Sequence, residues 1–249
     1  DQKGRLVFSL LADIAEQKQS QVYTIEASVV DLNNQEVSAR SAAVIHKGTF
    51  YIGLSPLSYV GTAGKEMKVR GITVDTQGIT RTHQSLEVVF YQHEWYSVKE
   101  KAEDGNYYWT NKVRDTAVAT ETVKTDALGR ALAGFVPPEG GMYKIVATGL
   151  DVYENEVRSA AYVWVSDREF VNWRRENTDR IELIADKKSY RPGETAQILI
   201  PSPYQGATTA LLTIERGHIL EHRILQLEGN SEQLDIPILP DYAPNVFVS

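Results

Sequence analysis

The stretch "DKKSYRPGETAQILIPSPYQG", residues 186–206, decides the fold because a turn signal leads directly into a strand. Pro192 and Gly193 form the turn signal, since proline presets one backbone angle and glycine accepts the left-handed region. The run Ala196–Ile200 is apolar at four positions of five, and Pro201 and Pro203 end it. None of these residue types points to catalysis, so the stretch predicts a structural element that opens a domain.

A second stretch, "SYVGTAGKEMKVRGITVD" at residues 58–75, repeats the same order of features. Both read Ser-Tyr, a short loop with glycine, a polar pair and then a strand. Gly64 and Gly193 lie 129 positions apart. A repeat of this length indicates tandem domains, and units of about 110–120 residues suit a seven-stranded β-sandwich.

Alternation of apolar and polar residues predicts β-strands along the chain. In Gln21–Leu32, one face carries Tyr23, Ile25, Ala27 and Val29, and the other is mostly polar. Turn residues separate such runs every 8–15 positions, which favours antiparallel β-sandwiches. Leu6–Gln17 is compatible with either a short helix or a strand. Further alternating runs are expected at 36–46, 68–75, 85–98, 116–126, 131–137, 142–151 and 157–166.

Four of the connections share one form: an apolar strand end, an aspartate, then asparagine or glycine, then a new strand. We expect the aspartate to accept backbone N–H groups and the asparagine or glycine to take a positive φ. Acidic turns can bind calcium, but these lie in separate hairpins without the dense acidic spacing of a calcium loop. The four are Val29–Val37, Thr73–Ile79, Lys124–Ala131 and Gly149–Val157.

The boundaries follow from composition. Residues 167–180 are polar and charged without alternation, which predicts a linker, and Trp173, Arg174 and Arg175 in it are expected to pack between neighbouring domains. A second boundary is placed after residue 54. We therefore expect a partial domain at 1–54, a complete sandwich at 55–166 and a partial domain at 181–249. An alternative is that the two end segments pair with each other.

Composition excludes several function classes. The chain has no cysteine, so it holds no disulfide, thiolate metal site or cysteine nucleophile. Acidic residues outnumber basic ones by 33 to 26, which argues against nucleic acid as a partner. No apolar run approaches the roughly 18–20 residues of a transmembrane segment. The start, "DQKGRLVF", does not resemble a signal peptide.

One motif could carry chemistry. "HILEH", His218–His222, matches the His-x-x-Glu-His pattern of a zinc peptidase class, which works on a helix. Here it follows a strand-like run that ends in Arg-Gly, so a hairpin is expected. On a strand, His218 and His222 would lie about 13 Å apart, too far to share one ion, and Glu221 would point the other way. We therefore expect no catalytic, cofactor-binding or metal-binding residues, and the zinc peptidase stays a remote alternative.

The remaining candidates are weaker. His46, His83 and His93 stand singly. The aromatic residues in "EWYS" (94–97) and "NYYWT" (106–110) suit either strand-face packing or contact with a partner.

Three long stretches resemble the bacterial alpha-2-macroglobulins: residues 21–54, 125–166 and 185–219, together with the closing "PILPDYAPNVFVS" at 237–249. The resemblance covers nearly the whole chain. It implies an all-β fold of tandem seven-stranded antiparallel macroglobulin sandwiches, which are like immunoglobulin and fibronectin-III domains. It also implies that residues 181–249 lead toward a bait region.

For function, the resemblance implies a non-catalytic scaffold segment of a broad-spectrum protease trap, with proteases and neighbouring macroglobulin domains as partners and no cofactor. Members are periplasmic or at the cell surface. Many carry a Cys-x-Glu-Gln thioester, which a chain without cysteine cannot hold. An alternative function, from another class of protein, is that of a tandem-sandwich adhesin or cell-surface spacer.

Overall fold

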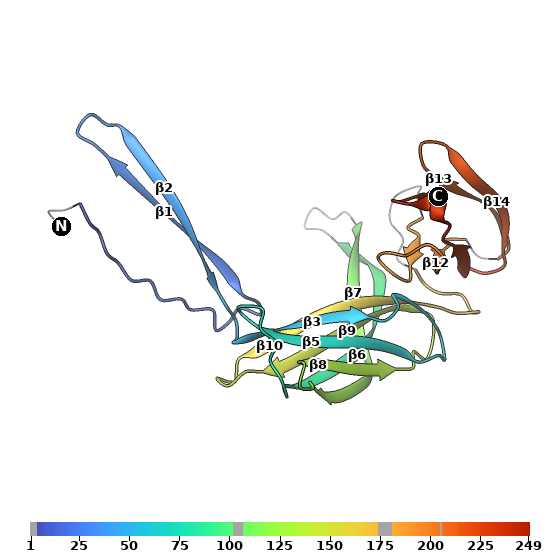
Figure 1. The fold of residues 1–249 in the computed structure, drawn as a ribbon, viewed down its shortest axis with the longest axis horizontal. Helices are drawn as coiled ribbons and strands as arrows, with labels where there is room; N and C mark the ends of the chain where they lie inside the picture. The colour runs from blue at the N-terminus through green and yellow to red at the C-terminus, as the bar shows by residue number, and fades with distance from the viewer. Residues whose placement is uncertain (1–3, 102–106, 174–180, 205) are drawn as a thin grey trace.

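The computed structural model describes residues 4–101, 107–173, 181–204 and 206–249, with side chains described outside 97–111. Its regular structure is β apart from one short 3₁₀ helix, as the sequence predicts. Three units follow one another along the chain: an N-terminal hairpin, a central sandwich and a C-terminal unit (Figure 1).

The central sandwich consists of two sheets. One has the strand order β3-β5-β8 and the other β4-β10-β9-β6-β7; only β4 and β10 pair in parallel. The sandwich thus has seven long strands and the short β4. The strands are β3 (Phe50–Pro56), β4 (Val60–Thr62), β5 (Met67–Asp75), β6 (Ser85–Lys101), β7 (Tyr107–Lys124), β8 (Arg130–Phe135), β9 (Gly141–Leu150) and β10 (Glu156–Ser166).

The sandwich core comes from alternate residues of both sheets. On β6, Leu86, Val88 and Phe90 all point inward and are at most 2% exposed. Phe90 stacks on Phe135 of the opposite sheet, with ring centroids 4.4 Å apart. Burial of each such side chain contributes about 1.5–3 kcal/mol, so this core holds the two sheets together.

The sandwich begins earlier than the sequence suggests. β3 crosses the boundary expected after residue 54, pairs along its whole length with β5, and buries Phe50 to 2% exposure. The boundary is placed just before the Ser-Tyr signal at residues 58–59, which lies after this strand rather than before it. Residues 50–54 therefore belong to the central sandwich.

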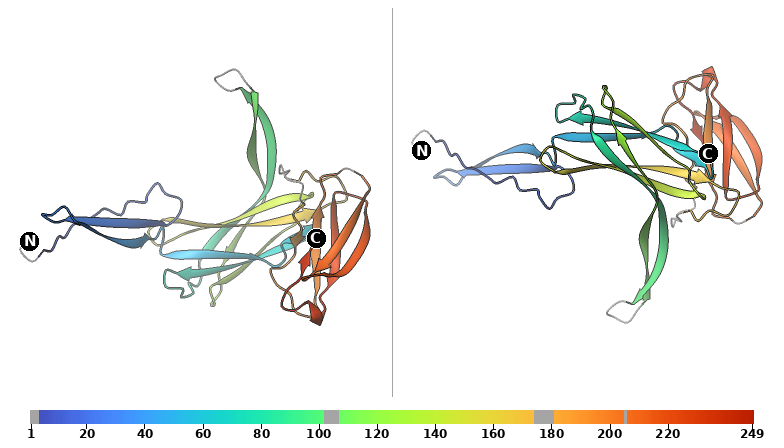
Figure 2. Two further views of the ribbon diagram at one scale, coloured as in Figure 1. Left: turned by 90° about the horizontal axis from the view of Figure 1, so that it is seen from above. Right: turned by 90° about the horizontal axis from the view of Figure 1, so that it is seen from below.

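The β6–β7 hairpin is longer than the sheet that carries it. β6 pairs with β9 only as far as His93, and beyond this point the hairpin leaves the sandwich as a two-stranded arm (Figure 2). At the base, Asp115 binds both His93 and the Lys144 ammonium, the latter at 2.7 Å. The aromatic stretch 94–97 begins this arm, while the side chains of 106–110 lie outside the described residues.

The N-terminal unit is a single hairpin of β1 (Gln21–Val30) and β2 (Glu36–Ile45), preceded by an extended segment (Figure 1). Leu6–Gln17 forms neither the helix nor the strand that its pattern allows, because it pairs with no strand among the described residues. The hairpin forms its own two-stranded sheet, and neither face is covered along most of its length.

This hairpin repeats the β9–β10 hairpin at an offset of 120 residues. The pair Tyr23↔Ala43 in the first corresponds to Tyr143↔Val163 in the second, and the offset holds along the whole ladder. Five inner-face and turn positions carry the same residue in both hairpins. These identical pairs are Tyr23/Tyr143, Ile25/Ile145, Ala27/Ala147, Asp31/Asp151 and Val37/Val157.

The C-terminal unit has two three-stranded sheets, ordered β11-β12-β15 and β14-β13-β16. They enclose a second core, which includes Leu212, Ile214 and Ile236. The elements are β11 (Ile184–Ala185), β12 (Thr195–Pro201), β13 (Thr208–Glu215), β14 (Ile219–Leu227), β15 (Ser231–Pro237), the 3₁₀ helix η1 (Pro240–Tyr242) and β16 (Phe247–Val248).

This unit repeats the central sandwich strand by strand. The pair Ile184↔Leu199 of β11–β12 lies 129 positions after Ser55↔Arg70 of β3–β5, the same offset as between Gly64 and Gly193. β13–β14 corresponds to the β6–β7 hairpin, β15 to β8, and β16 to the start of β9.

The opening turn is the same in both units. Gly64 and Gly193 have positive φ values of 75° and 89°. Their amides donate to Pro137 and Ile238 at 2.9 and 2.8 Å, which ties each opening turn to the end of β8 or β15. Glycine is required here because other residues rarely adopt such a φ. The stretch 186–206 therefore opens a sandwich, as predicted.

The four aspartate turns also share one geometry, which confirms the prediction for them. In each, Asp Oδ1 accepts the N–H groups two and four positions later at 2.7–2.9 Å. The residue three positions later has a positive φ. Glu154 takes this place in the fourth turn, where asparagine or glycine was expected. The aspartates are Asp31, Asp75, Asp126 and Asp151.

Candidate functional site

The joint between the central sandwich and the C-terminal unit is the most elaborate polar contact between units. The Tyr59 amide donates to the Asp186 carbonyl at 2.9 Å, and the Lys188 ammonium lies 5.7 Å from the Tyr59 ring centroid. The two Ser-Tyr loops, 58–59 and 189–190, thus lie at the same joint.

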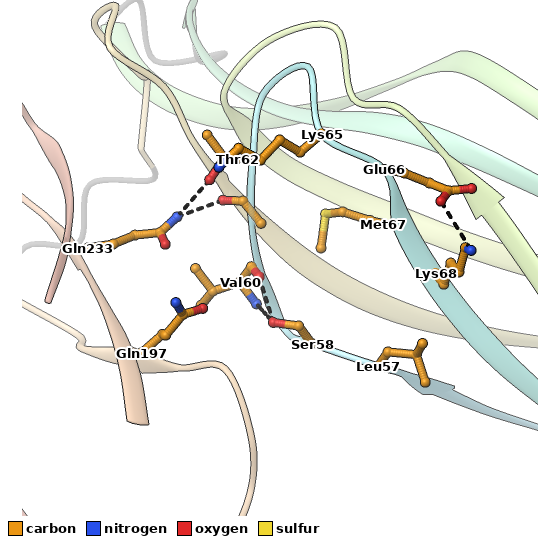
Figure 3. Close-up of a pocket in the computed structure, with 11 residues that line it drawn as sticks. Leu57, Ser58, Val60, Thr62, Lys65, Glu66, Met67, Lys68, Gln197 and Gln233 are labelled. Atoms are coloured by element: carbon orange, nitrogen blue, oxygen red, sulfur yellow. Dashed lines mark hydrogen bonds and ion pairs between the residues drawn. The ribbon is translucent and has the colours of Figure 1, made fainter. Parts of the chain in front are cut away.

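Gln233 of β15 connects the C-terminal unit to β4 (Figure 3) and also to β10. Its amide nitrogen lies 2.9 Å from the Gly61 carbonyl, 3.3 Å from Thr62 Oγ1 and 2.5 Å from Ser166 Oγ. Ser166 Oγ also donates to the Gly61 carbonyl at 3.1 Å. One side chain of the C-terminal unit is therefore bonded to two strands of the sandwich.

Asn230 binds the connecting segment through its side chain. Its amide oxygen accepts the Val171 N–H at 3.0 Å, and its amide nitrogen donates to the Val171 carbonyl at 2.7 Å. Asn230 and Val171 are 4% and 3% exposed, so water cannot replace these bonds. The segment is thus fixed against the turn between β14 and β15.

Asp167 and Ser231 complete the network. Ser231 Oγ accepts the Asp167 N–H at 2.8 Å and donates to the Asp167 carbonyl at 2.9 Å. Asp167 Oδ2 accepts the Gly140 N–H at 2.9 Å. A Cβ on Gly140 would lie 2.5 Å from Val171 Cγ2, so only glycine fits there without a shift.

The sequence predicts that Trp173, Arg174 and Arg175 of the linker pack between neighbouring domains. Trp173 is half-buried, and its indole N–H donates to the Asn230 carbonyl at 2.7 Å. Arg174 and Arg175 lie outside the described residues. Sequence reasoning missed Asn230, Ser231 and Gln233, because "GNSEQ" reads like any hairpin turn followed by a strand.

A cavity of about 410 Å³ opens at this joint (Figure 3). Polar groups around it include Lys65, Glu66 and Lys68, and Glu66 pairs with Lys68 at 3.1 Å. Gln197 and Gln233 reach it from the C-terminal unit. With one carboxylate already paired to a lysine, the cavity contains no acid/base couple.

The other joint, between the hairpin and the sandwich, depends on Asp151. Its Oδ2 accepts the Thr49 N–H at 3.0 Å, while its Oδ1 holds the β9–β10 turn. Burial acts to raise the pKa of Asp151, but hydrogen bonds from Asn155, Tyr153 and Thr49 outweigh it and lower the pKa below its usual value. Gly48 packs here, since a Cβ would lie 2.4 Å from Val157 Cγ2.

The His-x-x-Glu-His motif forms a hairpin, as expected. Ile219–Leu227 is strand β14, with His222 opposite Thr213. Glu221 binds Arg223 at 2.6 Å and accepts the Tyr242 hydroxyl at 3.2 Å. Among the described residues, no group of three or more His, Cys, Asp or Glu side chains could hold a metal ion. Within the same residues, no helix has the length and apolar character to cross a membrane.

The comparisons with known proteins agree with this architecture. Residues 181–249 match the family model of the alpha-2-macroglobulin bait region domain. An alpha-2-macroglobulin homolog of Nostoc sp. is 28% identical over 226 residues, which is 91% of this chain and 12% of the relative. Residues 181–249 therefore resemble the bait region domain of the alpha-2-macroglobulins, and 91% of the chain is similar to one member of that family. The alpha-2-macroglobulins that it resembles are non-catalytic protease inhibitors.

Two further alpha-2-macroglobulins are similar to this chain. The Pasteurella multocida protein is 23% identical over 156 residues, 62% of this chain and 8% of the relative. The cryo-EM reconstruction of the native E. coli protein is 20% identical to this chain, with a TM-score of 0.51. The match covers 100% of this chain and 16% of the E. coli chain. The latter likeness shows the fold. The chain spans about a tenth of the curated alpha-2-macroglobulins that it matches.

Proposed function

We propose that this chain is a scaffold segment of a broad-spectrum, protease-trapping alpha-2-macroglobulin. Its role is to hold the bait region domain in a defined orientation until a protease attacks. The observation that carries this proposal is the joint at Asn230 and Gln233, which bonds the unit matching the bait region domain to a complete sandwich. Stiff sandwiches with a bonded joint move as rigid bodies and can transmit a rearrangement.

The proposal extends to the domain organisation. Residues 1–45 are the end of another macroglobulin sandwich, residues 50–166 a whole one, 167–180 a linker, and 181–249 the start of a further one that leads toward the bait region. Support comes from the offsets of 120 and 129 residues. They align the N-terminal hairpin with β9–β10 of the central sandwich and the C-terminal unit with its other strands.

Partners and location follow from the same proposal. Attacking proteases are the targets of the whole protein, and adjoining macroglobulin domains are the direct partners of this chain. Within this chain, Trp173 belongs to the contact between the central sandwich and the C-terminal unit through its hydrogen bond to Asn230. We place the protein in the periplasm or at the cell surface, the compartments where foreign proteases are met.

The test uses the longer protein that contains this chain. A protease is incubated with it, and turnover of a small peptide substrate is compared with turnover of a large protein substrate. An enclosed protease still cleaves the peptide and loses activity on the protein. Equal activity on both substrates, with or without the inhibitor, would contradict the proposal.

A further inference from the structure

The cavity at the joint between the central sandwich and the C-terminal unit has a volume of about 410 Å³, which is enough for a small ligand. Figure 3 shows Gln197 and Gln233 of the C-terminal unit on one side of it, and Met67 and Lys68 of the sandwich on the other. We propose that this cavity binds a small organic carboxylate that also carries an amide and an aliphatic group. This is the chemistry of the C-terminal residue of a peptide.

One part of the cavity wall is apolar. Val60 and Met67 line it, and they are only 4% and 8% exposed. Gly61 lets Met67 lie against the backbone of β4, because a Cβ on Gly61 would be 2.3 Å from Met67 Sδ. The flexible thioether of methionine adapts to the shape of an apolar group. This part of the wall therefore favours a ligand with an aliphatic side chain over a fully polar ion such as phosphate.

The charged part of the wall has an excess of positive charge. Lys68 is paired with Glu66 at 3.1 Å, whereas no carboxylate of the described residues pairs with the Lys65 ammonium. The local excess contrasts with the net charge of −7 for the whole chain. One uncompensated ammonium matches one carboxylate, and the carboxylate displaces no existing partner when it binds.

Amide groups complete the wall. The Gln197 side chain is exposed and makes no hydrogen bond with any described residue, so it can pair with a ligand amide. The Gln233 amide nitrogen already binds the sandwich, which fixes that side chain at the edge of the cavity. A ligand in the cavity contacts both units, so its binding also stabilises the joint between them.

A peptide end combines one carboxylate, one amide and one side chain within the size of the cavity. Proteolysis creates such ends, so a cleaved peptide as the source of the ligand rests on the proposed function. The binding itself depends only on the cavity. A chain that binds the carboxylate without trapping a protease would thus refute the proposed function and leave the site in place.

The two methionines of the chain provide the test, because Met67 lines the cavity and Met142 does not. The 249-residue chain is labelled with carbon-13 at the methionine methyl groups, and Met142→Leu assigns the two NMR signals. N-acetyl-leucine is the probe for a peptide C-terminus. Three further probes each lack one of its features: N-acetyl-leucinamide has no charge, hexanoate has no amide, and inorganic phosphate has no apolar group.

We expect N-acetyl-leucine to shift the Met67 signal with a dissociation constant of about 1 mM and to leave the Met142 signal in place. N-acetyl-leucinamide and hexanoate should each bind about fivefold more weakly. The proposal is overturned if the Met67 signal does not move at about ten times this concentration, or if both signals move alike. Equal binding of N-acetyl-leucine and its amide, or tighter binding of phosphate, also overturns it.

Variants then locate the carboxylate. Lys65→Gln should weaken the binding of N-acetyl-leucine about fivefold, whereas Lys65→Arg should retain it. Gln197→Ala should weaken it about twofold to fivefold. Lys124→Gln removes an exposed lysine outside the cavity and should have no effect. Lys65 and Gln197 are exposed, so their variants should keep the fold, and unchanged binding by Lys65→Gln would overturn the proposal.

Discussion

Tyr23 and Tyr143 hold the same position in two hairpins 120 residues apart, and their hydroxyls make the same bond. Tyr143 donates to the Glu139 carbonyl at 2.8 Å, and Tyr23 donates to the Asp13 carbonyl at 3.0 Å. Each acceptor lies in the loop before its strand. Only Tyr143 is fully buried, and burial raises its pKa to about 12. The same hydrogen bond is therefore made by a fully buried tyrosine in one hairpin and by a half-buried tyrosine in the other.

Ile25 and Ile145, at the next inner position of the two hairpins, allow the effect of burial on stability to be compared. Ile145 is 2% exposed in the sandwich core, whereas Ile25 is only half-buried. Ile145→Ala should lower the free energy of unfolding by about 2–5 kcal/mol because it leaves a cavity. Ile25→Ala should cost less than about 1 kcal/mol. Chemical denaturation of the two variants checks this, and equal losses would contradict the uncovered state of the hairpin.

Asp151 should make the sandwich sensitive to acid. Its pKa is lowered in the folded state, so it stabilises the fold above the unfolded pKa of about 3.9. This contribution disappears as the pH falls through the folded pKa. Asp151→Asn should cost about 1–3 kcal/mol at neutral pH and progressively less in acid.

Asp31→Asn is the matched control for Asp151→Asn. Asp31 holds the same turn but is exposed. Its replacement should change stability little at any pH. Urea denaturation over a pH series gives both profiles, and a constant loss for Asp151→Asn across the series would contradict the role of its charge.

Two glycines in aspartate turns separate backbone strain from steric contact. Gly78 and Gly129 both have positive φ, but a Cβ on Gly129 would lie 3.0 Å from the carbonyl oxygens of Arg81 and Thr73. A Cβ on Gly78 meets nothing within 4 Å. Gly78→Ala should cost about 1–2 kcal/mol, and Gly129→Ala should cost more. Thermal unfolding that ranks them in the opposite order would contradict this geometry.

Asn230 should couple the two units. Asn230→Ala leaves the Val171 N–H and C=O without partners in a buried place, which costs about 1–3 kcal/mol. We expect the C-terminal unit to unfold earlier than the sandwich in this variant, as two steps in differential scanning calorimetry. Gln226→Ala, at an exposed site on β14, should leave the profile unchanged. If both variants leave the unfolding profile unchanged, the Asn230 joint does not couple the stability of the two units.

The local features could be predicted from the sequence. The aspartate turns and the glycines at 64 and 193 were found because their geometry depends on a few adjacent residues. The expected boundary divides β3 because it is placed just before the Ser-Tyr signal at residues 58–59, while the strand character of β3 comes from pairing with β5.

The long-range features could not be predicted in this way. Tyr23, Ile25 and Ala27 recur at 143, 145 and 147, but such residues suit any strand, and only the shared register reveals the repeat. Asn230 and Gln233 look like ordinary turn and strand residues. Their roles depend on contacts with Val171 and Gly61, far away in the chain.

The joint at Asn230 and Gln233 should hold the sandwich and the C-terminal unit together as one rigid body in the resting state. Since the chain has no cysteine, Leu132→Cys and Ile224→Cys provide unique dye sites at exposed positions on the two units. Single-molecule energy transfer between the dyes should give one narrow distance distribution. Added Asn230→Ala and Gln233→Ala changes should broaden it. A distribution that is already broad before these changes would contradict a rigid joint between the two units.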